Sequence, residues 1–259
     1  MTFEATFYLD APIAPDVLLS FADSFEGRLN GMTITDTDLR STRLAKPNPK
    51  AITAAFAGAK APNQILLIEK GKDGNNNYPA FYLNFSRLPS AHPDENCYAL
   101  ILGAPAELEE VFAKTWFNLA ATAGLKAGIG YQQIYPNDSF AYATFNPAAP
   151  LSPDDLWQRI YAAFIRYTDD PASFHPVTKG KILRSVLSYN FMPLSLAEQI
   201  KQVLSAAGLP AEGWTNLGKS ELWHIPSAQK QRAAYEALAA QNLVWETVWI
   251  DVATYQPPE

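Results

Sequence analysis

Residues 97–135 are the most informative part of the chain for the fold, with the sequence CYALILGAPAELEEVFAKTWFNLAATAGLKAGIGYQQIY. The apolar run over 97–102 predicts a strand, and the Gly-Ala-Pro at 103–105 predicts a turn after it. From 105 to 123 the apolar residues recur every three or four positions, which predicts a helix. Gly124 follows that pattern and is expected to end the helix.

The same spacing predicts which side of this helix contacts the core. The expected core-facing residues are Leu108, Val111, Phe112 and Leu119, with Trp116 beside them. Two strands are then expected over 128–135 and 140–145, paired around a turn. Strands that follow each other directly do not fit a parallel α/β sheet, in which strands and helices alternate, and favour an antiparallel α+β fold.

The N-terminal part of the chain gives similar signals. Residues 2–9 alternate between two sets of side chains, which predicts a half-buried strand. Residues 64–70 and 80–86 are strand-like runs on either side of a Gly- and Asn-rich turn, as in a β-hairpin. Pro15 is expected to open a helix, because proline at the first helical position loses no hydrogen bond. Shorter elements are predicted as a strand over 32–37 and a helix over 49–59.

The segment 146–151, with two prolines, is the best internal boundary. Beyond it, Ser195 and Glu198 have the spacing of a capping box at a helix start, and Ser227 is expected to cap a later helix. The other predictions are a helix from 152, an irregular polar segment over 168–181, an ambiguous segment over 182–191, and strands over 221–225 and 243–255.

These elements together predict an α+β protein with a mixed, mostly antiparallel sheet or sheets packed by about five helices. A single compact domain over 1–259 is expected, with a division into subdomains 1–146 and 152–259 as the alternative. Whether the strands form one sheet or two is left open by the sequence.

Composition excludes several classes of function. The chain has 259 residues, a net charge of -6 and 48% hydrophobic residues. It has no apolar run of the roughly 20 residues that a membrane span needs and no basic cluster for nucleic acid or an anionic membrane. The N-terminus lacks the pattern of a secretory signal, and one cysteine, Cys97, excludes an internal disulfide framework. A cytoplasmic protein with no nucleic-acid or membrane partner is therefore expected.

Motifs for catalysis, cofactors and metals are missing from the sequence. There is no Gly-rich phosphate loop and no Gly-x-Ser-x-Gly elbow. The three histidines, His92, His175 and His224, are not spaced as a metal-binding pair. No catalytic residue, cofactor or metal ligand is therefore predicted, and the chain is more consistent with a protein that is not an enzyme.

Recognition of a protein is the remaining class, because Trp, Tyr and Phe are enriched in the cores of interfaces. The sequence has six Trp, 12 Tyr and 14 Phe. Aromatic residues on polar segments are expected to be exposed: Tyr78, Tyr131, Tyr135, Tyr167, Trp214 and Tyr255. Acidic residues expected to match a basic partner are Asp36, Asp38, Asp169 and Asp170. Of these two sets, Tyr131 and Tyr255 are candidates for exposure only, and the others are the predicted partner-binding residues.

The chain is expected to be an acidic, aromatic-rich α+β protein of intermediate size. In these general properties it resembles the immunity proteins that bacteria pair with their own secreted toxins. No residue motif assigns it to a particular family. The resemblance implies a protein that occludes a toxin or effector by covering its active site. Two alternatives stay open: a small-molecule enzyme or ligand binder with scattered site residues such as His175, Asp169 and Tyr167, and a structural protein that forms a homo-oligomer.

Overall fold

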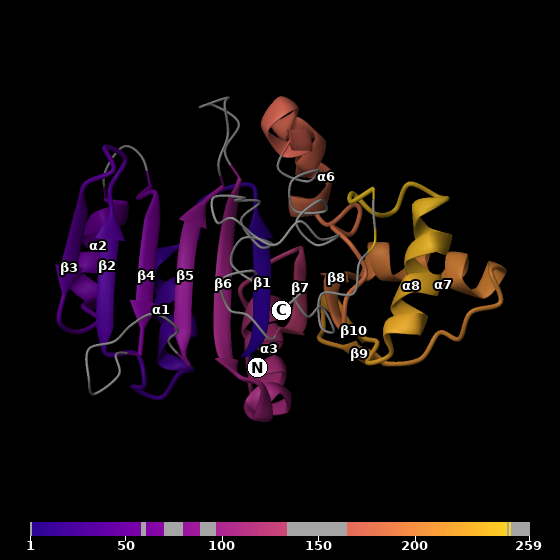
Figure 1. Cartoon of the computed structure of the whole chain (residues 1–259), viewed down its shortest axis with the longest axis horizontal. Coiled ribbons are helices and arrows are strands. Elements are labelled where there is room, and N and C mark those ends of the chain that lie inside the picture. The colour runs from indigo at the N-terminus through magenta and orange to yellow at the C-terminus, as the bar shows by residue number, and fades with distance from the viewer. Residues whose placement is uncertain are drawn as a thin grey trace, which may run out of the picture.

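A computed structural model describes residues 2–57, 61–69, 80–88, 97–133, 165–247 and 249. Within these residues, ten strands form one sheet with the order β3-β2-β4-β5-β6-β1-β7-β8-β10-β9, and every pair of neighbouring strands is antiparallel (Figure 1). The predicted α+β class with a mostly antiparallel sheet is confirmed. One sheet, and not two, holds the strands of both halves of the chain.

The bounds of the elements follow the chain. The strands are β1 (Thr2–Leu9), β2 (Gly31–Thr35), β3 (Ser41–Leu44), β4 (Gln64–Ile68), β5 (Tyr82–Arg87), β6 (Tyr98–Pro105), β7 (Gly128–Gln133), β8 (Tyr189–Pro193), β9 (Trp214–Asn216) and β10 (Ser220–His224). The helices are α1 (Pro15–Asp23), α2 (Pro49–Phe56), η1 (Ala106–Leu108), α3 (Glu109–Thr122), η2 (Pro171–Phe174), α6 (His175–Thr178), α7 (Leu194–Ala206) and α8 (Ala228–Ala239).

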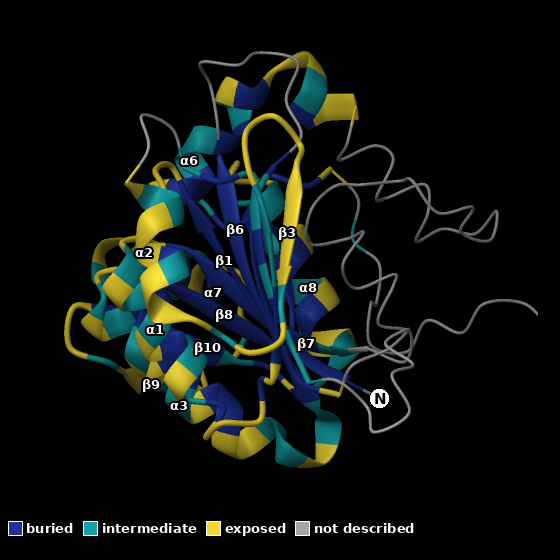
Figure 2. Cartoon of the chain, turned by 90° about the vertical axis from the view of Figure 1, so that its left-hand side faces the viewer, coloured by how far each residue is buried: buried dark blue, intermediate teal, exposed yellow. Residues whose placement is uncertain are grey.

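Strand β1 lies in the middle of the sheet, and all eight of its residues are buried, so the prediction of a half-buried strand is wrong. Its side chains alternate between the two faces of the sheet. Phe3 and Phe7 point to one face, called face A here, which α1, α2 and α3 cover. Glu4 and Tyr8 point to the other, face B, on which α6, α7 and α8 pack. Figure 2 shows the buried central strands behind the exposed edge strand β3, with α1, α2 and α3 to one side.

The core of face A is aromatic. Phe3 stacks on Trp116 of α3 with ring centroids 5.8 Å apart, and Phe7 contacts Phe117 at 5.5 Å. Trp116 is completely buried, whereas Val111 is 62% exposed. The prediction that Val111 faces the core, with Trp116 only beside the core-facing residues, is therefore wrong. Helix α3 is turned so that its aromatic residues fill the space under β1.

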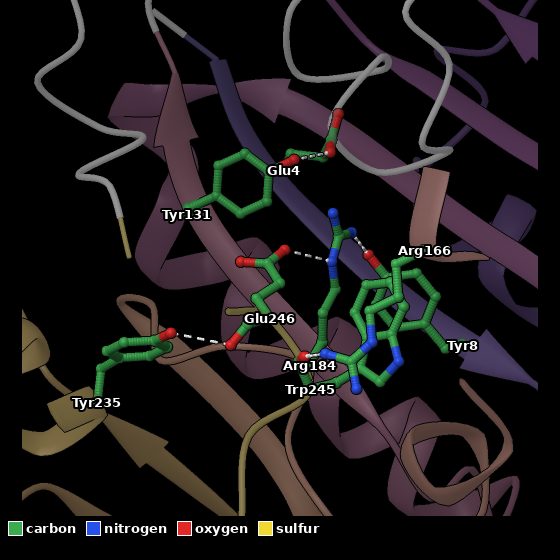
Figure 3. Close-up of polar contacts among 8 residues, drawn as sticks. All are labelled: Glu4, Tyr8, Tyr131, Arg166, Arg184, Tyr235, Trp245 and Glu246. Atoms are coloured by element: carbon green, nitrogen blue, oxygen red, sulfur yellow. Dashed lines mark hydrogen bonds and ion pairs between the residues drawn. The ribbon is translucent and has the colours of Figure 1, made fainter. Parts of the chain in front are cut away.

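Face B differs from face A because charged and hydroxyl side chains are buried in it. The Glu4 carboxylate accepts hydrogen bonds from the hydroxyls of Tyr82 and Tyr131, each at 2.5 Å. Near it, the guanidinium of Arg184 forms an ion pair with Glu246 at 2.9 Å, and both side chains are almost wholly buried (Figure 3). Arg184 also donates to the hydroxyl of Tyr8 on β1, and this contact links the segment around Glu246 to the sheet.

Four local predictions need correction. The predicted turn at 103–105 is part of β6, because this segment pairs with β1. Helix α7 begins at Leu194 without a side-chain cap, one residue before the serine predicted to cap it. The segment 168–181, predicted as irregular, contains η2 and α6. The described part of the predicted strand 243–255 forms one isolated bridge, between Leu183 and Val244.

Other local predictions are confirmed. Ser227 caps α8 by accepting a hydrogen bond from the backbone of Lys230, and Gly124 follows α3 with a positive φ of 72°. Strands β4 and β5 form the predicted antiparallel pair. The segment 146–151, the helix predicted from 152 and the strand predicted over 140–145 lie outside the described residues. Within the described part of the chain, no helix has the length and apolar character needed to cross a membrane.

Candidate functional site

A groove of about 800 Å³ opens on face A between α3 and the strands β8, β10 and β9. Helices α7 and α8 pack on face B of these strands, at the right-hand end of the sheet in Figure 1. Helix α3 and the short helix η1 before it border the groove on face A. Part of face A is therefore open to solvent at the end of the sheet that β8, β10 and β9 form.

The floor of the groove is a pair of stacked rings. Tyr189 on β8 and His224 on β10 are directly paired across the two strands. Their ring centroids are 4.3 Å apart and their planes differ by 5°. Phe117 of α3 stacks against Tyr189 at 5.8 Å, so the three rings form a column that ends at His224 among the described residues.

The wall of the groove is acidic. Glu107 lies in η1, Glu109 and Glu110 lie in the first turn of α3, and Lys114 is the basic residue of the groove lining. Acidic side chains are favourable in the first turn of a helix because they interact with the positive end of its dipole. The Glu109 carboxylate accepts a hydrogen bond from the side-chain amide of Gln132, which holds it beside the rings.

Burial sets the protonation states of the two rings. It raises the pKa of Tyr189, and a hydrogen bond to Glu109 together with the charges of Glu109 and Glu110 raises it further. Tyr189 therefore remains a hydrogen-bond donor at neutral pH. Burial lowers the pKa of His224, which the charge of Glu109 only partly opposes. The imidazole is therefore neutral near pH 7.

This shift predicts a pH-dependent contribution of His224 to stability. Because the folded pKa lies below the usual 6.5, the unfolded chain takes up the proton first and acidification favours unfolding. As the pH falls through 6.5, we expect the free energy of unfolding of wild type to decrease relative to that of His224→Gln. The difference should stop growing once the pH is below the pKa of His224 in the folded protein. Urea unfolding midpoints of both proteins across this range measure the difference. Parallel pH profiles would contradict the prediction.

A second hollow, of about 560 Å³, lies on face B between α7, α8 and the end of β10. Its lining includes apolar residues such as Leu204, Trp223 and Ile225. An exposed ion pair between Lys230 and Glu212 is also part of the lining. A hollow of this size and character is suited to a small apolar ligand.

The predicted acidic residues do not meet at either hollow. Asp36 lies in the β2–β3 turn, where its carboxylate accepts hydrogen bonds from the backbone of Asp38 and Arg40, both at 2.9 Å. This turn is at the opposite edge of the sheet from β9. Asp169 and Asp170 are exposed, and Asp170 caps η2 by accepting from the backbone of Ser173 at 3.2 Å. Asp36 therefore has a turn role and Asp170 a cap role.

The predicted aromatic residues have different outcomes. Tyr167 is buried against Phe174 on face B, and Tyr131 is buried against Glu4, so neither ring is exposed as expected. Trp214 is partly exposed on β9. Tyr78, Tyr135 and Tyr255 lie outside the described residues.

Trp214 is held between two neighbours on face B. Its ring stacks on Trp223 with centroids 4.9 Å apart and planes 3° apart. The ammonium of Lys201 lies 4.5 Å from the same ring. These contacts cover much of the indole, and Trp214 does not line the groove on face A.

Sequence reasoning missed the groove. The glutamates of its wall and Tyr189 are not among the predicted site residues, and His224 was considered only as a metal ligand. Tyr189 and His224 are far apart in the sequence and meet through strand pairing, so no local pattern marks them. In the described part of the chain, no group of three His, Cys, Asp or Glu side chains is placed to bind a metal.

No protein-family model matches the sequence, and no curated protein is significantly similar to it. Among solved structures, the Pseudomonas aeruginosa T6SS protein PA0821 is similar, with a TM-score of 0.54 and 12% identity over 98% of this chain and 76% of that chain. The first condensation domain of the CDA synthetase aligns over 94% of this chain and 70% of that one, at 12% identity and a TM-score of 0.18. Only the likeness to PA0821 supports an argument, and it concerns the fold.

Proposed function

We propose that this protein is a non-catalytic protein-binding module, an immunity or inhibitor protein that occludes a bacterial toxin or effector in the cytoplasm. The observation that carries the proposal is the open groove on face A, with three glutamates along its wall and stacked rings on its floor. Interfaces combine aromatic anchors with charges that match the partner. The groove offers both.

Electrostatics supports a basic partner. The chain carries a net charge of -6, and three of the charged residues that line the groove are acidic against one lysine. Such a field speeds association with a positively charged surface and disfavours acidic competitors. Toxins that act on nucleic acids or other anionic substrates have basic active sites, which this surface would cover.

The likeness of the fold to a T6SS protein is consistent with this proposal. That protein carries the secretion-system association in its name, and this chain shares its fold at 12% identity. The same association is part of our proposal for this chain, with a secreted effector as the partner. The other predicted residues stay candidates for contacts outside the groove: Asp36, Asp38, Tyr78, Tyr135, Asp169, Asp170 and Trp214.

The proposal is tested by affinity capture from the native organism, followed by binding measurements with the captured partner. We expect a stable complex that Glu109→Lys with Glu110→Lys weakens by roughly tenfold or more, mainly through a slower association rate. Glu236→Lys, an exposed change on α8 away from the groove, is the control and should leave the affinity within about twofold. Absence of any stable partner, or equal effects of both changes, would contradict the proposal.

A second candidate function is binding or conversion of a small molecule. It is favoured by the meeting of His224, Tyr189 and Glu109 from distant parts of the chain beside one groove. A neutral imidazole next to a carboxylate is a common acid–base arrangement. Melting-temperature screening against a metabolite library tests it, because a ligand of this groove would stabilise wild type but not His224→Gln. A library without hits that protect wild type would remove this candidate.

A further inference from the structure

We propose that the groove on face A receives an arginine side chain of the partner, with its guanidinium stacked on His224 and paired with Glu109. This inference rests on the proposed function, because it names the chemistry of the partner at the same surface. It specifies one residue type and one position, which the proposed function does not.

The ring column provides the stacking surface. The ring centroids of Phe117, Tyr189 and His224 follow one another at 5.8 Å and 4.3 Å, and the planes of the last two rings are nearly parallel. Among the described residues, His224 is the last ring of the column, and it is partly exposed and lines the groove. A guanidinium is flat and weakly hydrated, so it stacks on such a ring, whereas an ammonium does not.

The carboxylate of Glu109 provides the charge. The amide of Gln132 and the hydroxyl of Tyr189 donate to it and fix its position, but both donors are neutral. In the described part of the chain, no Lys, Arg or His forms an ion pair with Glu107, Glu109 or Glu110. A carboxylate has about four acceptor sites. Glu109 therefore keeps acceptor capacity and its full charge for a donor from outside.

Arginine fits these two features better than lysine. Its rigid fork of N–H donors matches a carboxylate with two parallel hydrogen bonds while its plane remains free to stack. Lysine supplies a charge but no plane. The neutral His224 does not repel the incoming cation, and protonation of His224 would. The groove is therefore selective for arginine on a protruding loop of a basic protein.

Short peptides test this without knowledge of the partner. The probes are Ac-Gly-Arg-Gly-NH₂ and the same peptide with lysine or citrulline, titrated into the full-length protein and followed by two-dimensional NMR. We expect the arginine peptide to shift the amide signals of groove residues such as Thr215, Leu222 and Glu110. The lysine peptide should bind roughly fivefold or more weakly, and the uncharged citrulline peptide should not bind detectably.

Two variants locate the site. Glu109→Gln should weaken the arginine peptide by roughly tenfold, since it removes a charge-assisted hydrogen bond. Glu236→Gln, an exposed acid on α8, should leave the affinity unchanged. The same spectra show whether each variant is folded. Equal binding of the arginine and lysine peptides, shifts outside the groove, or no shifts at millimolar peptide would each overturn the inference. Capture of a partner that Glu109→Lys with Glu110→Lys weakens would still support the proposed function in those cases.

Discussion

Replacing Glu246 by alanine is expected to lower the free energy of unfolding by about 3–5 kcal/mol. Arg184 and Glu246 are 0% and 1% exposed and form an ion pair at 2.9 Å (Figure 3). Without the carboxylate, the guanidinium stays buried and loses the ion pair that Glu246 makes with it. The hydroxyl of Tyr8, to which Arg184 also donates, cannot replace the lost charge. Urea unfolding followed by fluorescence measures the change.

An exposed ion pair in the same protein is the matched control. Arg232 and Glu236 are paired at 3.1 Å on α8, and their side chains are 68% and 64% exposed. Because water screens such a pair, Glu236→Ala should change the free energy of unfolding by less than about 0.5 kcal/mol. Replacing both buried partners, as Arg184→Met with Glu246→Leu, should recover much of the loss, since no unpaired charge remains. A Glu246→Ala variant within about 1 kcal/mol of wild type would contradict the argument.

Elements specified by their own residues could be predicted from the sequence. Strand β1 lies where the alternation over 2–9 predicted a strand, although both of its faces are buried, and α1 begins at Pro15 as expected. The cap of α8 by Ser227 is also a contact within four residues of chain. Local patterns of this kind give a correct fold class, because short-range preferences and the final structure agree there.

Elements that depend on distant partners could not be predicted. The segment 103–105 contains glycine and proline, which favour a turn, yet it pairs with the start of β1 and so extends β6. The structure shows why residue 103 is a glycine: a Cβ atom at this position would lie 2.1 Å from the ring of Tyr82. The close approach of Tyr82, which donates to Glu4, is a long-range requirement.

The candidate site could not be predicted for the same reason. Its floor depends on the register that places Tyr189 opposite His224, and its wall comes from a helix about 80 residues earlier in the chain than Tyr189. Taken singly in the sequence, each of these residues has an ordinary structural interpretation. The residues predicted to contact a partner lie elsewhere and stay a prediction; of the acids among them, Asp36 also serves a turn and Asp170 a helix cap.

The rotation of α3 places Trp116 in the core, where its replacement is expected to have a large effect on stability. Trp116 is completely buried and contacts Phe3, Phe25 and Phe112, with ring centroids 5.8, 5.4 and 4.8 Å away. Its indole N–H also donates to the hydroxyl of Ser24 at 3.0 Å. We expect Trp116→Ala to lower the free energy of unfolding by about 3–5 kcal/mol, because it removes the contacts and leaves a cavity.

The same helix provides the control that separates packing from helix propensity. Val111 is 62% exposed, so Val111→Ala removes few contacts, and alanine is the better helix former. We expect this variant to change stability by no more than about 0.5 kcal/mol, in either direction. Trp116→Phe should retain part of the packing and lose the hydrogen bond to Ser24, so its stability should lie between wild type and Trp116→Ala. If Val111→Ala were the more damaging change, α3 would have to be rotated toward the face that its sequence pattern suggested.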